Sequence, residues 1–169
     1  MEHQIIIKKL KDNLNTYISL LSDTSEDEYL FRPAEGKWCL LEIVCHLYDE
    51  EQSDFRARVK HALENTEGDP PKIDPQGWVK SKNYIERDYF ETLEKFLDER
   101  RKSVEWLNSP EDPQWKNEYI HPNFGGMSAE FFLSNWLAHD YLHFRQIIYI
   151  KYNYLKQKGG QDLIYAGEW

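Results

Sequence analysis

The sequence predicts an all-α fold, a four-helix bundle built as a single domain over residues 1–169. Three observations lead to this fold class. Four long stretches carry apolar residues three or four positions apart, which is the spacing of one buried helix face. Segments that contain proline and glycine separate these stretches. A bundle is the simplest arrangement in which four such faces bury one another, and the chain is long enough to form a core without disulfide staples.

The first helix is expected over about residues 3–22, where the apolar face is regular. Its apolar positions are Ile6, Leu10, Leu14, Tyr17 and Leu21. The segment "SDTSEDEYLFRPAEGKW" then ends this helix with a turn, a proline and a glycine. Within that segment Ser25-x-x-Glu28 resembles a capping box, which predicts one further helical turn.

The second helix is expected from about Cys39 to Asn65, and the connection after it is long. Its apolar stripe is Leu40, Ile43, Val44, Leu47, Phe55 and Val59. The following "EGDPPKIDPQGW" holds three prolines and two glycines, which argues against a helix there. The connection over residues 65–80 is long enough to cross the bundle. Helices two and three are therefore either antiparallel or, with such a crossover, parallel.

The third helix is expected from about Ser81 to Asn108, where Ser109-Pro110 stops it. Residues 110–127 are irregular, with room for a few extended residues. Ser128 is placed to cap a fourth helix that runs from Ala129 to about Leu155, before Gly159-Gly160.

The composition narrows the classes of partner. Acidic residues outnumber basic ones 30 to 21, a formal net charge of −9, and this charge repels phosphate backbones, so no nucleic-acid partner is expected. No apolar run approaches the roughly 18 residues of a membrane span, and "MEHQIIIKKLKDNL" lacks a signal-peptide core. We therefore expect a cytoplasmic protein without membrane partners, in which Cys39 and Cys45 are small, reduced, buried residues.

Two histidines four residues apart, His139 and His143, stand in the apolar run "WLAHDYLHFRQII". Side chains at this spacing share one helix face, so both imidazoles can bind one metal ion. A third ligand is expected from the second helix, where His46 lies on the apolar stripe and would be costly to leave unpaired. Glu50, one turn further on, is the candidate catalytic residue: a general base, a partner for an imidazole N–H, or a fourth ligand. Asp49 beside it is a second candidate for the first two roles.

The histidine pair differs from the zinc-protease motif HExxH. The sequence reads "HDYLH", with Asp140 where that motif has glutamate, and aspartate is one methylene shorter. The third ligand expected downstream is also missing. A metalloprotease is therefore not expected.

Two blocks of the sequence resemble the DinB/YfiT-like family. The first block, residues 32–59, begins with "RPAEGKW" and continues into a helix with "EIVCHLYDEE". The second, residues 121–147, runs from "HPNFGGMSAEFF" to "HDYLHFRQI". Both blocks occur in the family's order and spacing. Together they are much more specific than either the histidine pair or His46 alone.

The resemblance implies a four-helix bundle with a divalent metal, zinc or nickel, held by one histidine of the second helix and two of the fourth. By motif these are His46, His139 and His143. Characterised members are mostly metal-dependent transferases that use low-molecular-weight thiols such as bacillithiol or mycothiol, and others are maleylpyruvate isomerases with such a thiol as cofactor. The resemblance also leaves room for a homodimer.

The leading hypothesis is a transferase that uses a thiol co-substrate, activated at a three-histidine metal site. Its partners would be a small-molecule thiol and an electrophile. A bound divalent cation strongly favours the thiolate, which is the nucleophile. Two alternatives remain: a metal-dependent hydrolase with water in place of the thiol, and a non-catalytic metal-binding module.

Overall fold

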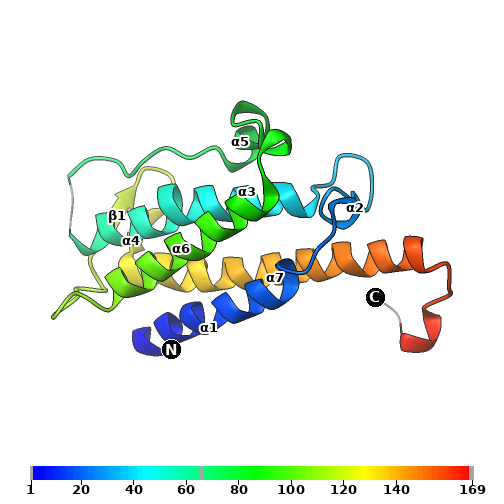
Figure 1. Cartoon of the computed structure of the whole chain (residues 1–169). Helices are drawn as coiled ribbons and strands as arrows, with labels where there is room; N and C mark the ends of the chain where they lie inside the picture. Colours follow the sequence, from blue (N-terminus) through cyan, green and yellow to red (C-terminus); the bar gives the residue numbers. More distant parts are fainter. Residues whose placement is uncertain (1, 65–66, 168–169) are drawn as a thin grey trace.

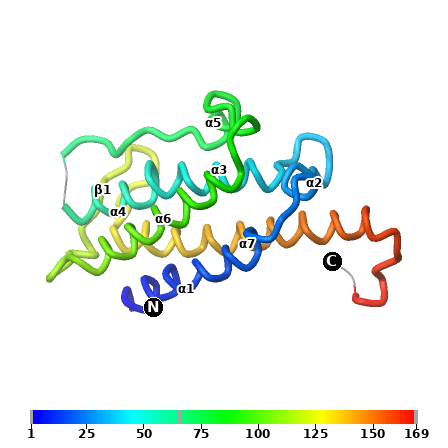
Figure 2. Tube along the Cα trace, viewed as in Figure 1, coloured from blue at the N-terminus to red at the C-terminus, as the bar shows by residue number. Residues whose placement is uncertain are grey.

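A computed structural model describes residues 2–64 and 67–167, and it is built mainly from helices (Figures 1 and 2). Four long helical rods lie side by side, which confirms the predicted all-α four-helix bundle. The rods are α1 (His3–Leu21), the continuous run of α3 (Leu40–Glu50), η1 (Glu51–Phe55) and α4 (Arg56–Leu63), then α6 (Tyr89–Leu107) and α7 (Ala129–Gly159).

The chain direction in the rods establishes the topology. Figure 1 shows α1 and α7 running one way, whereas the α3–α4 rod and α6 both run the other way. The connection from the end of α4 to the start of α6 returns along the length of the bundle (Figure 2). Helices two and three are therefore parallel, joined by the long crossover that the sequence allowed.

The crossover contains a helix, α5 (Pro75–Ser81), and a short 3₁₀ turn, η2 (Tyr84–Glu86). Our expectation of no helix near the prolines is wrong at this point, because Pro75 occupies the first helical turn, where its missing N–H costs nothing. The Asp74 carboxylate caps α5 by accepting a hydrogen bond of 3.0 Å from the Gly77 N–H.

The third long helix starts later than Ser81. Asn83, with a φ of 51°, takes the left-handed conformation that separates α5 from η2. Asp88 then caps α6, accepting a 2.7 Å hydrogen bond from the Glu91 N–H.

The second rod is not α-helical throughout, because η1 (Glu51–Phe55) is a turn of π-helix between α3 and α4. The apolar pattern predicts a plain α-helix here, and that prediction is wrong for these five residues. A π-turn holds one more residue per turn, and it rotates the residues after it relative to those before it. Glu51 and Asp54 are both buried in this turn.

The remaining elements are short. One helical turn, α2 (Glu26–Tyr29), follows Ser25 as predicted, although the Ser25 side chain makes no capping bond. The strands β1 (Glu118–His121) and β2 (Gly125–Ser128) form an antiparallel hairpin within the segment expected to be irregular. A further 3₁₀ turn, η3 (Ile164–Ala166), follows α7.

Helix α7 begins where the sequence predicts and ends slightly later. The Ser128 hydroxyl accepts a 3.1 Å hydrogen bond from the Phe131 N–H, and Gly160, with a φ of 63°, ends the helix. Although α7 has 31 residues, no helix among residues 2–64 and 67–167 combines the length and apolar character needed to cross a bilayer.

The core has two apolar clusters with a buried polar layer between them. One cluster joins the second half of α1 to α3, the start of α6 and the middle of α7. The other joins the start of α1 to α4, the end of α6 and the start of α7. Among the buried polar residues between these clusters, one from each rod belongs to a single hydrogen-bonded network: Asn13, Glu51, Arg100 and Asp140.

Arg100 is the centre of this polar layer, and its side chain is only 1% exposed. Its two terminal nitrogens donate hydrogen bonds of 2.7 and 2.8 Å to the two Asp140 oxygens, and its Nε donates one of 2.8 Å to Glu51. Asn13 and Tyr17 of α1 also donate to Asp140, at 2.8 and 2.9 Å. One guanidinium therefore connects all four rods.

We expect Arg100→Leu to lower the free energy of unfolding by about 3–5 kcal/mol, because it leaves two buried carboxylates without their cation. Urea unfolding followed by circular dichroism measures this change. Arg101→Leu is the matched control, since Arg101 is exposed and pairs with Asp98 on the same face of α6. An unfolding midpoint that is similar in the two variants would show that the layer contributes no more than a surface pair.

Candidate metal centre

The three histidines chosen from the sequence converge between α3 and α7. The Nε2 atom of His139 lies 3.2 Å from that of His46 and 3.0 Å from that of His143. The coordinating atoms of all three lie within 4.8 Å of one another, and no other set of three or more such residues does so in the described part of the chain.

Local packing explains why these rings face one another. His139 and His143 are one turn apart on α7, and Asp140 between them faces the core, where Arg100 holds it. This anchor fixes the rotation of α7 about its axis. On α3, His46 is 5% exposed, and its ring centroid lies 5.0 Å from that of Trp38.

The nitrogen spacing fits a shared divalent cation. Two imidazole nitrogens bound at about 2.0–2.1 Å lie about 2.8–3.4 Å apart, depending on whether the geometry is octahedral or tetrahedral. The observed 3.0 and 3.2 Å fall within this range.

Burial keeps the three imidazoles neutral. It lowers the pKa of His46 to about 3, and the charge of His143 adds to this shift. It lowers the pKa of His143 to about 4, although the carboxylate of Asp140 opposes the shift. Burial, the other two imidazoles and Arg100 hold the pKa of His139 well below its usual value. Neutral imidazole is the form that coordinates a metal.

Glu50 lies one turn beyond His46 and is 3% exposed, but it is not part of the converging group. Its carboxyl group faces Asp54, and its Oε1 atom has no hydrogen-bond partner. Burial, with a further contribution from Asp54, raises the pKa of Glu50 to about 9. At neutral pH Glu50 therefore holds a proton, which fits a proton donor better than a general base or a ligand.

The other carboxylates considered from the sequence have structural partners. Asp49 lies 3.1 Å from the ammonium group of Lys82 and 3.4 Å from the guanidinium group of Arg87. It therefore anchors the crossover to α3 and does not orient a histidine. Asp140 belongs to the core network, where Arg100, Asn13 and Tyr17 donate to its carboxylate.

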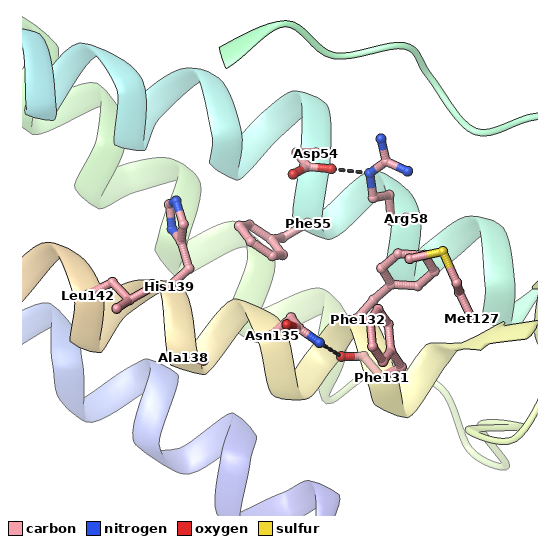
Figure 3. A pocket seen from close by; sticks show the side chains of 10 residues that line it. All are labelled: Asp54, Phe55, Arg58, Met127, Phe131, Phe132, Asn135, Ala138, His139 and Leu142. Atoms are coloured by element: carbon pink, nitrogen blue, oxygen red, sulfur yellow. Dashed lines mark hydrogen bonds and ion pairs between the residues drawn. The ribbon is translucent and has the colours of Figure 1, made fainter. Parts of the chain in front are cut away.

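A pocket of about 320 Å³ opens beside the histidines, between η1–α4 and the first half of α7 (Figure 3). His139 belongs to its wall, and the ring centroid of Phe55 lies 4.9 Å from that of His139. The sequence analysis did not find this pocket, because its residues come from η1, α4, β2 and α7 and share no local pattern. They are Asp54, Phe55, Arg58, Met127, Phe131, Phe132, Asn135, Ala138, His139 and Leu142.

Comparisons with known proteins establish the family and the fold. A sequence profile of the DinB superfamily matches residues 9–147. The chain belongs to the DinB superfamily. The matched range includes all three histidines of the DinB-type cluster, and it confirms the resemblance found from the two sequence blocks. No curated protein sequence matches the chain.

Among solved structures, YfiT from Bacillus subtilis is similar to this DinB-superfamily chain. The TM-score is 0.78 at 18% sequence identity, and the match covers 94% of this chain and 88% of YfiT. YfiT is described as a probable metal-dependent hydrolase with an unusual four-helix bundle topology. At this identity the similarity supports the shared fold.

The histidine pKa values predict acid sensitivity of the metal-free protein. The folded chain keeps His46 and His143 neutral down to about pH 3 and 4, whereas the ordinary pKa of 6.5 applies in the unfolded chain. The unfolded state then binds more protons, so the free energy of unfolding falls as the pH falls from 6.5 towards 4. Each buried histidine contributes about 1.4 kcal/mol per pH unit in this window.

Urea unfolding at several pH values between 7 and 5, with and without His143→Gln, measures this contribution. The substitution removes one titrating group, so the stability of the variant should depend less steeply on pH, by about 1.4 kcal/mol per unit. His121→Gln, in the hairpin, is the control. Parallel curves for wild type and His143→Gln would contradict the depressed pKa.

Proposed function

We propose that this protein is a metal-dependent transferase in which His46, His139 and His143 hold a divalent cation, zinc or nickel, that activates a low-molecular-weight thiol. The observation that carries this proposal is the convergence of three neutral imidazoles, two buried and the third, His139, partly exposed to a pocket. Such a cation retains its full charge and lowers the pKa of a bound thiol or water. The resemblance to thiol-dependent DinB/YfiT-like transferases supports the choice of thiol.

The carboxylates around the pocket also favour a thiol. Asp54 forms an ion pair with Arg58, and Glu50 is protonated at neutral pH. The site therefore offers no free ionised base to deprotonate a weakly acidic nucleophile. A thiol, with a pKa of about 8.5, needs far less help than water, with a pKa of about 15.7.

The residues have separable roles in this proposal. The imidazoles would fix the position of the cation, and Phe55 with the other apolar side chains would contact the substrate in the pocket. The thiol releases its proton to solvent, the sulfur attacks an electrophilic carbon, a C–S bond forms, and the bond to the leaving group breaks with its electron pair. Glu50 stores a proton that can reach the leaving group through Asp54, which lies between Glu50 and the pocket.

A metal-dependent hydrolase is the second candidate, because YfiT, which has the same fold, is described as a probable enzyme of that kind. Water would then replace the thiol, with the same three imidazoles and the same protonated Glu50. A non-catalytic module is less well supported. It would call for Glu50 as a fourth ligand or for the lack of a cleft, whereas Glu50 lies outside the converging group and a pocket adjoins it.

Metal binding is tested first. Protein purified without a nickel column should carry about one divalent ion per chain, and His139→Ala should carry almost none, because two histidines alone make a weak site. Elemental analysis and the change in melting temperature on chelation measure this. His121→Ala is the matched control and should keep the metal, and full metal content in His139→Ala would remove the basis of the proposal.

The chemistry is tested on metal-loaded protein with bacillithiol and an aryl chloride. Loss of free thiol together with release of chloride is expected. The role of Glu50 is tested with an epoxide, because its departing oxygen needs a proton whereas chloride does not. Glu50→Gln should retain the metal and open the epoxide about tenfold or more slowly. Ester or amide hydrolysis without thiol consumption would instead identify a hydrolase.

A further inference from the structure

Apolar side chains form most of the wall of the pocket next to His139. Phe55 lies against the His139 ring, and Phe131, Phe132 and Leu142 continue the apolar lining along α7 (Figure 3). Met127 of the hairpin lies at the end of the pocket away from His139. A molecule held here would contact apolar side chains and one proposed metal ligand at once.

The charged side chains of the pocket compensate one another. Arg58 donates to the Asp54 carboxylate, and it also donates a 3.4 Å hydrogen bond to the Pro71 carbonyl. The Arg58 guanidinium carbon also lies over the ring of Phe132, 5.9 Å from its centroid. An anionic ligand would therefore meet the Asp54 carboxylate, whereas a cationic one would compete with Arg58. Neither sign of charge has a free partner.

We infer that this pocket binds the electrophile of the reaction, and that the electrophile is an uncharged molecule with an aromatic or similarly flat apolar group. The role of this ligand as the electrophile rests on the proposed function. Its binding in the pocket does not require the metal. A volume of about 320 Å³ suits a small molecule, since ligand pockets range from about 300 to 1,000 Å³. Phe55 offers a ring face for stacking next to the reaction centre.

The test uses two ligands that differ mainly in charge, chloronitrobenzamide and chloronitrobenzoate, titrated into metal-free full-length protein and followed by ligand-observed NMR. The uncharged amide should bind at least about tenfold more tightly than the anion. Ala138→Phe places a ring in the pocket and should weaken amide binding by at least about tenfold. Ile148→Phe is the control, because Ile148 is an exposed residue of α7 that lines a separate apolar groove near the end of that helix.

A second variant covers the case in which Ala138→Phe folds poorly. Met127→Glu places a carboxylate at the partly exposed end of the pocket and should also weaken amide binding. Leu155→Lys alters a separate apolar groove near the end of α7, and this variant should bind the amide as tightly as wild type. Equal affinity for amide and benzoate, or loss of binding only in Leu155→Lys, would overturn the inference.

The metal content of each variant separates this inference from the proposed function. Amide binding that depends on Ala138 in a protein that takes up no metal would support the pocket and refute the transferase. Stoichiometric metal binding without amide affinity would refute the pocket assignment alone.

Discussion

The buried guanidinium of Arg100 is the constraint on which the rest of the structure depends. Removing a cation and two carboxylates from water is costly, and only complete hydrogen bonding offsets that cost. The network meets this requirement, because both Asp140 oxygens accept two bonds each and the second Glu51 oxygen accepts one of 3.1 Å from the Trp136 indole. An apolar core tolerates small rotations of a helix, whereas this network is satisfied in one arrangement of the four rods.

The same network positions the candidate metal centre. Asp140 is adjacent to His139 in the chain and three residues before His143, so holding its carboxylate inward directs both rings towards α3. Glu51, also bound by Arg100, begins the π-turn five residues after His46. The charge of Arg100 contributes to the low pKa of His139, which favours the neutral, metal-binding form. Arg100 thus contributes both to the arrangement of the four rods and to keeping the candidate metal ligand His139 neutral.

Sequence reasoning found the parts of the molecule that have a local pattern. The period of apolar residues predicts the four helices. The spacing of His139 and His143, together with the position of His46 on an apolar stripe, predicts the three-histidine cluster. Sequence reasoning missed α5, because the proline count outweighed the favourable position of Pro75. It missed the π-turn and the role of Arg100, because a charged residue on an amphipathic helix is ordinarily solvent-exposed, and only tertiary contacts show that this one is buried.

The charges of the site favour different positions for the two proposed substrates, the thiolate at the metal centre and the electrophile in the pocket. Three neutral imidazoles contribute no negative charge, so a bound cation would favour an anionic ligand such as a thiolate. The adjoining pocket is apolar and internally compensated, with Asp54 paired to Arg58 and Glu50 protonated. A negatively charged nucleophile and an uncharged electrophile would therefore each find only one suitable place. Such a division orders the two reactants by electrostatics before any contact specific to either one is made.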